Sequence, residues 1–286
     1  MPAGQIGTDK RADLAAAKEP LRWTDLSSWH PLLTAMLEDL LEPGAIRRLE
    51  QVEASDLYDD DPEWLDLVVD EYAGDEEQLI ESISGRLQPL SVRVFRGTRT
   101  ADAGSFTEQG IRLHDRSRLE AEIRDLVEQH SDLSWMVPTL DEKFESTAHL
   151  IDEGRCYVVV DERVLIEECG HYLLGGSEFL QGIIGPEWAQ SVLSDCAPTV
   201  IEVDLPLRRV APSFLAEFSR KLVGEWAKIL RRKRAEAGRL DFTFTLREPV
   251  PPSWVIGHFH PKIINDPHRR RAAVNVERPH CAACVG

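Results

Sequence analysis

The chain has 286 residues, 42% of them hydrophobic, and a formal net charge of −17. This length allows one large domain or two small ones with a substantial core, and the ordinary hydrophobic content argues against wholesale disorder. No apolar stretch approaches the ~20 residues that cross a bilayer. No secretory signal is expected, because no apolar stretch follows a basic one near the N-terminus. The odd number of cysteines, five, predicts reduced thiols, and we expect a cytoplasmic protein without membrane contact.

The negative charge is concentrated in residues 1–90, which hold 21 acidic and 7 basic side chains and therefore −14 of the total −17. This surplus argues against direct nucleic-acid binding by that region. It predicts either a solvated helical surface or a surface for a basic partner. Basic side chains gather instead at 228–234 and 269–271. We expect them to attract the acidic region of the same chain, or alternatively a nucleic-acid acceptor.

In chain order, residues 1–20 are polar and predict a flexible tail, and residues 21–88 predict an acidic helical region. Apolar residues in that region recur at three- and four-residue spacing. Ser28 is the expected cap of the first helix. Further helices are expected to begin near Pro62 and Asp75.

At Pro89 the pattern changes to alternation, so residues 90–96 predict a half-buried strand. Strands mixed with helices favour the α+β class over a doubly wound sheet. We expect a catalytic domain at 89–265 and a C-terminal tail at 266–286. Further elements are expected as helices at 115–130 and 213–237 and as strands at 144–150, 156–160, 164–166, 199–205 and 240–246.

Three segments carry candidate chemistry. In the first, Val94-Phe95-Arg96-Gly97-Thr98, an arginine at a strand end can grip a phosphate through two parallel hydrogen bonds, and the glycine lets a ligand approach the backbone.

The second segment is Phe144-Glu145-Ser146-Thr147-Ala148, whose two hydroxyls can orient a sugar or a neighbouring carboxylate. In the third, Gly170–Leu180, glycines surround Glu178 and suggest a loop that presents this acid at the start of a strand. A carboxylate there could stabilise an oxocarbenium-like transition state.

These motifs, in this order, resemble the Arg–Ser–Glu class of the ADP-ribosyltransferase superfamily, which includes toxin-like enzymes that split NAD at the nicotinamide–ribose bond. The resemblance covers about residues 90–185. It implies a core with a split mixed or antiparallel β-sheet. It also implies that Arg96 holds the NAD phosphates, that Ser146 orients Glu178, and that Glu178 binds the nicotinamide ribose and stabilises the cation.

The resemblance implies further NAD contacts by neighbours of these residues. Thr147 would support the strand of Ser146, and Gly97 and Thr98 would lie beside the ligand with His171 and Tyr172, although Tyr172 could instead fill the core. The first motif is also similar to the poly-ADP-ribosyl and DNA-modifying branch, in which Tyr157 would be the tyrosine on the next strand. Glu178 is shared by both branches.

The resemblance implies ADP-ribose transfer to a protein or nucleic-acid acceptor, in the setting of a toxin or phage-defence effector with an inhibitor or antitoxin protein. Arginine-modifying members carry an acid or Gln two residues before the catalytic glutamate. Here that position is Gly176, which argues against an arginine acceptor. NAD glycohydrolysis, with water as the acceptor, is an alternative.

Structural roles remain as alternatives for each motif. Arg96 could form a surface ion pair, Ser146 and Thr147 could cap a helix, and Glu178 could be the first acid of a helix, where the helix dipole favours it.

The chain closes with Cys281-Ala282-Ala283-Cys284, a spacing that can clasp zinc if two further ligands arrive. His260 with His268, or His258 with His280, are the candidate second pairs. On a strand, His258 and His260 would share one face. The alternative is a flexible tail with exposed thiols, and a non-catalytic, zinc-stabilised interaction protein is a third function to weigh.

Overall fold

The computed structural model describes residues 19–51, 57–59, 61–276 and 281–284. Its helices and antiparallel strand pairs place the chain in the α+β class. The chain divides into a helical unit, Met1–Arg93 with Asp204–Phe242, and a mixed unit, Val94–Val203 with Thr243–Gly286. The helical unit is built from two separate stretches of the chain, because Asp204–Phe242 belongs with the N-terminal helices. None of the described helices has the length and apolar character needed to cross a membrane.

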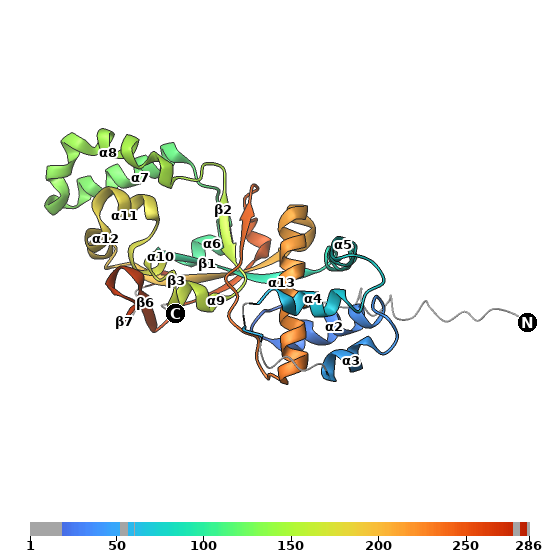
Figure 1. The fold of residues 1–286 in the computed structure, drawn as a ribbon. Helices are drawn as coiled ribbons and strands as arrows, with labels where there is room; N and C mark the ends of the chain where they lie inside the picture. Colours follow the sequence, from blue (N-terminus) through green and yellow to red (C-terminus); the bar gives the residue numbers. More distant parts are fainter. Residues whose placement is uncertain (1–18, 52–56, 60, 277–280, 285–286) are drawn as a thin grey trace, which may run out of the picture. The chain divides into compact units, whose positions relative to one another are not determined.

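In the helical unit, N-terminal helices pack around one long helix from later in the chain (Figure 1). The helices expected within residues 21–88 and 213–237 are confirmed. Asp25, not Ser28, caps the first one: its carboxylate accepts from the Ser27 N–H at 3.0 Å, whereas the Ser28 hydroxyl donates to the Asp25 carbonyl. The bounds are α2 Leu26–Glu38, α3 Ala45–Gln51, α4 Glu63–Val69, α5 Glu76–Leu87 and α13 Pro212–Arg232.

A tryptophan hydrogen bond and an ion pair connect α13 to the N-terminal region. The fully buried Trp226 donates from its indole N–H to the Thr34 hydroxyl at 2.8 Å. At the basic end of α13, Arg232 forms an ion pair with Asp59, and Arg231 donates to the Glu50 carbonyl at 2.9 Å. These contacts confirm the expectation that the basic helix end attracts the acidic region of the same chain.

The mixed unit is organised around a five-stranded sheet, counted over the described residues, in the order β4-β2-β1-β3-β5. β2 pairs antiparallel with β1 and β4, and β3 pairs antiparallel with β5. The strands expected near 90–96, 156–160, 199–205 and 240–246 are confirmed. The bounds are β1 Ser91–Thr100, β2 Cys156–Val159, β3 Ala197–Pro206, β4 Thr243–Leu246 and β5 Val255–Phe259.

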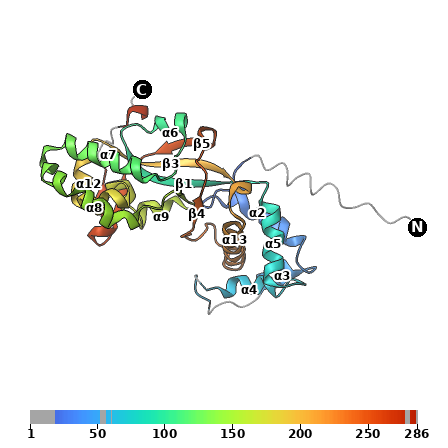
Figure 2. The same ribbon diagram turned by 90° about the horizontal axis from the view of Figure 1, so that it is seen from above.

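Part of the expected C-terminal tail is ordered. β6 Ile263–Asp266 and β7 Ala272–Asn275 pair antiparallel as a separate two-stranded sheet. The 3₁₀ turn Ala282–Cys284 follows at the end of the described chain. Figure 2 shows α6, Gly104–Gln109, beside β5, the strand to which this turn returns.

Helices, not strands, form at two places where the sequence suggested strands. The strands expected at 144–150 and 164–166 are wrong, because these residues lie in α8 with the turn after it and in α9. In α8, Leu140 and Phe144 share one face and enter an apolar cluster with residues of the neighbouring helices. The bounds are α7 Arg116–Gln129, α8 Leu140–Thr147, α9 Glu162–Glu167, α10 His171–Gly175, α11 Glu178–Ile184 and α12 Pro186–Val192.

Candidate functional site

Two glycines, Gly170 and Gly176, allow the backbone conformation of the segment from α10 to α11. Gly176 has φ +73°, a left-handed conformation that favours glycine, at the turn between the helices. A Cβ on Gly170 would lie 2.1 Å from the Asn265 carbonyl oxygen, so only glycine permits this close approach to β6. Glu178 is therefore presented at the first position of α11 and not at the start of a strand, so that expectation is wrong.

Two ring side chains from α10 lie beside the Glu178 carboxylate. His171 Nε2 lies 3.3 Å from Glu178 Oε1, and the neighbouring Tyr172 phenol lies close enough for this carboxylate to raise its pKa. Since an ionised carboxylate only accepts, His171 donates from Nε2. Half of the Glu178 side chain stays accessible, at 52% exposure, against 14% for His171. The carboxylate is thus positioned by protein groups and open to a ligand.

Burial lowers the pKa of His171, and the Glu178 carboxylate opposes that effect. The ring is consequently neutral near pH 7, with its proton on Nε2. Within the described residues, the buried His171 Nδ1 has no hydrogen-bond partner.

A buried glutamine supports this arrangement from behind. Gln181 Nε2 donates to the carbonyls of His171, at 3.2 Å, and Gly176, at 3.0 Å, and so ties α10 to α11. The Gln181 side-chain oxygen Oε1 lies 3.2 Å from His268 Nε2, and the rings of His268 and His171 meet edge-on with centroids 5.6 Å apart. His268, a candidate zinc ligand by sequence, therefore belongs to the surroundings of Glu178.

Arg96 lies on β1, as predicted, with its guanidinium half-buried. Its Nη1 donates to the Tyr157 carbonyl at 3.0 Å and lies 3.6 Å from Cys156 Sγ, and its Nη2 lies 3.2 Å from His114 Nε2. Burial lowers the pKa of His114, and the Arg96 charge lowers it further. His114 is thus neutral near pH 7 and accepts from Arg96. The guanidinium has five N–H groups, so these contacts leave capacity for an anion.

The charges of Glu178 and Arg96 act on the pKa of the Tyr172 phenol in opposite directions. Burial raises the pKa of Tyr172 and the Glu178 carboxylate raises it further, whereas the Arg96 guanidinium acts in the opposite direction. Among the described residues no hydrogen bond or ion pair joins Arg96 to Glu178, and the Arg96 charge is the weakest of these influences on the phenol. We call Arg96, His171, Tyr172 and Glu178 the Glu178 cluster.

The other residues predicted to contact NAD near Arg96 take part in packing and hydrogen bonding within the protein. A Cβ on Gly97 would meet Leu165 at 3.3 Å and Leu173 at 3.4 Å, so this glycine makes room for leucines of α9 and α10. Thr98 follows on the same strand and is half-buried. Burial raises the pKa of the Tyr157 hydroxyl and the Asp152 carboxylate raises it further, while the Tyr157 backbone carbonyl accepts from Arg96.

Ser146 and Thr147 lie on α8, away from the role predicted for them. Both hydroxyls donate to the Lys143 carbonyl, at 3.0 Å and 2.6 Å. Ser146 is exposed, and over the described residues no hydrogen bond joins it to Glu178. The support that the sequence assigned to Ser146 comes instead from His171.

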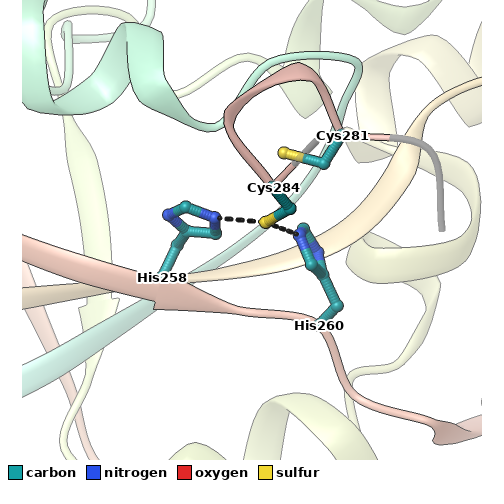
Figure 3. A group of neighbouring side chains, drawn as sticks. All are labelled: His258, His260, Cys281 and Cys284. Carbon is teal, nitrogen blue, oxygen red and sulfur yellow. Dashed lines mark hydrogen bonds between the residues drawn. The ribbon is translucent and has the colours of Figure 1, made fainter. Parts of the chain in front are cut away.

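A second polar cluster joins β5 to the end of the described chain (Figure 3). The ligand atoms of His258, His260, Cys281 and Cys284 all lie within 4.8 Å of one another, and this set could hold a metal ion. The two cysteines were predicted, but neither predicted histidine pair is right as a pair, because His258 and His260 act together. His280 lies outside the described residues.

Two residues of these sites were missed by sequence reasoning. His114 follows Arg96 by 18 residues without a motif, and only the fold brings the two together. Gln181 sits one turn after Glu178 on α11, a spacing that gives no sign of its bonds to the preceding turn. No family model, no curated protein and no solved structure matches this chain.

Proposed function

We propose that this chain cleaves NAD at the bond between nicotinamide and ribose and transfers the ADP-ribosyl group. The observation that carries the proposal is the accessible Glu178 carboxylate, which His171 holds at 3.3 Å beside the Tyr172 phenol. The half-buried Arg96 on β1 supplies the positive charge of the cluster. These are the charges that the reaction requires, a negative one for the ribosyl cation and a positive one for the phosphates.

In this proposal the C1′–N bond breaks, and both bonding electrons leave with nicotinamide, which neutralises its charged ring nitrogen. The positive charge passes to the ribose as an oxocarbenium-like species. The Glu178 carboxylate stabilises this cation and binds a ribose hydroxyl. The acceptor's nucleophile then bonds to C1′ and loses its proton.

Arg96 contributes binding and position. Its N–H groups beyond those used by Tyr157 and His114 would bind the pyrophosphate. His171 acts as a positioning residue, because it holds the carboxylate before the ligand arrives and spares the cost of ordering it during the reaction.

The acceptor is the open choice within this reaction class. Gly176 stands where arginine-modifying enzymes carry an acid or Gln, so an acceptor other than arginine is proposed. Water as the acceptor would give free ADP-ribose and would make the protein a glycohydrolase instead.

The test measures nicotinamide release from NAD by the wild type, Glu178→Gln and the matched control Glu187→Gln. Glu187 is an exposed acid in the first turn of the neighbouring α12. We expect Glu178→Gln to lower the rate about 10³-fold, the loss typical of one electrostatic stabiliser, and Glu187→Gln to match the wild type. No release by the wild type, or equal release by Glu178→Gln, would reject the proposal.

Product analysis with NAD labelled in the adenylate part separates the two acceptor classes. Label bound to a macromolecule supports transfer, whereas free ADP-ribose as the sole product assigns glycohydrolysis.

A further inference from the structure

We infer that His258, His260, Cys281 and Cys284 bind one zinc ion, whose role is to fasten the C-terminal turn 281–284 to β5 and to the segment after β1. This inference is independent of the proposed NAD chemistry, because it rests on other residues. The donor set is two thiols and two imidazoles, the combination that favours tetrahedral zinc.

The geometry is close to that of a zinc site. Zinc bonds of about 2.0–2.3 Å in a tetrahedron place the ligand atoms ~3.3–3.8 Å apart. Cys284 Sγ lies 3.2 Å from His258 Nε2 and 3.4 Å from His260 Nε2. All four ligand atoms lie within 4.8 Å of one another. Figure 3 shows both imidazoles directed at the Cys284 sulfur, with Cys281 beside it.

The surroundings of His260 select the tautomer that a metal needs. Its Nδ1 lies 2.9 Å from the Pro198 carbonyl and 3.2 Å from the Thr199 hydroxyl, which donates its own proton to the Ala197 carbonyl. Both neighbours therefore accept from Nδ1–H. The lone pair is left on Nε2, the atom that faces Cys284, as is usual for histidines that ligate a metal.

Backbone groups prepare Cys281 in the same way. Its sulfur is fully buried and accepts a hydrogen bond from the Ala103 N–H, with the nitrogen 3.5 Å away. The Ala282 N–H donates to the Ala101 carbonyl at 2.8 Å, so the turn 281–284 is attached at two points to residues 101–103. Cys281 is buried and Cys284 is exposed, and both sulfurs belong to the same group of possible ligand atoms. We therefore treat the two cysteines as a ligand pair.

The role is structural because the protein supplies all four ligands. Catalytic zinc keeps a position open for water or substrate, and structural zinc does not. The ion would link the strand β5, the turn 281–284 and, through the Ala101 and Ala103 bonds, the exit of β1. β1 is the strand that carries Arg96.

The test is the metal content of the full chain purified without a histidine tag. We expect one zinc per chain, lost in Cys281→Ser and in His258→Ala. Cys196→Ser and His149→Ala are matched controls, because neither residue belongs to the cluster, and they should keep the zinc. A wild-type protein free of metal, one equivalent of iron in place of zinc, or a Cys281–Cys284 disulfide in the mass spectrum would overturn the inference.

A second measurement uses the wild type alone, in case the variants fail to fold. Cobalt(II) added after removal of the metal should give the visible absorption of a tetrahedral site together with a thiolate charge-transfer band. In the zinc-loaded protein the amides of Ala103 and Ala282 should exchange slowly with deuterium, and a chelator should accelerate both. An octahedral cobalt spectrum, or exchange unaffected by the chelator, would contradict a zinc link at this point.

Discussion

Two short helices of the mixed unit, α9 and α11, both begin at an acidic side chain, and the two acids have opposite surroundings. Asp161 is fully buried at the start of α9, where it caps the Arg163 N–H at 3.0 Å and binds the Arg163 guanidinium at 2.7 Å. Glu178 at the start of α11 is 52% exposed and is held by His171 beside Tyr172. An acid whose oxygens are satisfied by backbone and arginine stabilises the fold, whereas an acid held in place but still accessible can serve a ligand.

The largest expected effect separates these two acids by stability. Asp161→Ala should lower the free energy of unfolding by about 2–4 kcal/mol, because it removes both the cap of α9 and the charge-assisted hydrogen bonds to Arg163. Glu178→Ala should change it by less than about 0.5 kcal/mol, as expected for an exposed position. Urea unfolding followed by circular dichroism measures both. Similar losses in the two variants would erase the distinction drawn between the two helix starts.

The second-largest expected effect is that of Arg96, which belongs to the Glu178 cluster, on the binding of NAD. Arg96→Gln should raise the KM for NAD about 10- to 100-fold, because a charge-assisted hydrogen bond contributes about 1.5–3 kcal/mol. Arg112→Gln, an exposed arginine bonded to Gln109 at 2.9 Å, is the control and should leave KM unchanged. Steady-state kinetics of nicotinamide release provide the values. An Arg96→Gln enzyme with the wild-type KM would remove Arg96 from the ligand site.

A smaller effect concerns the titration of His114 beside Arg96. Its pKa should lie below the ordinary value of 6.5, because of burial first and the Arg96 charge second, and Arg96→Gln should raise it. The unfolded chain then binds this proton more tightly than the folded one. The contribution of His114 to stability is therefore present above pH 6.5 and is lost as the pH falls below that value. NMR titration of the ring protons checks the direction, and an unshifted pKa in the wild type would contradict the Arg96–His114 contact.

The smallest expected effect is that of Ser146→Ala. Its hydroxyl bonds only within α8 in the described structure, to the Lys143 carbonyl. We therefore expect nicotinamide release to change by less than about twofold, in line with the small effects of surface substitutions. A large loss of activity would return Ser146 to the role that the sequence resemblance gave it and would weaken the role of His171.

The sequence predicted long elements well and short ones poorly. The helices of the acidic region show their period over many residues, and the strand that carries Arg96 alternates clearly. The runs at 144–150 and 164–166 are too short for a period to be decisive. They are helical because Asp161 caps α9 and because Phe144 packs against Phe179 of α11, with ring centroids 5.9 Å apart.

Within the two candidate sites, residues of local motifs could be predicted, whereas residues brought together by the fold could not. Arg96, Glu178 and the cysteine pair belong to local motifs and could be identified from the sequence. His171 and Tyr172 were placed near the ligand, but the hydrogen bond from His171 to Glu178 depends on the turn at Gly176. The contact of His114 with Arg96, and the contacts of His258 and His260 with Cys284, join distant segments, which the spacing of residues does not predict.

The most direct measurement is the position of NAD in a crystal of the Glu178→Gln variant, which should bind the dinucleotide without splitting it. We expect the nicotinamide ribose within hydrogen-bonding distance of the side chain at position 178 and the pyrophosphate on the Arg96 guanidinium. NAD bound elsewhere, or no NAD at saturating concentration in a crystal with this surface accessible, would contradict it.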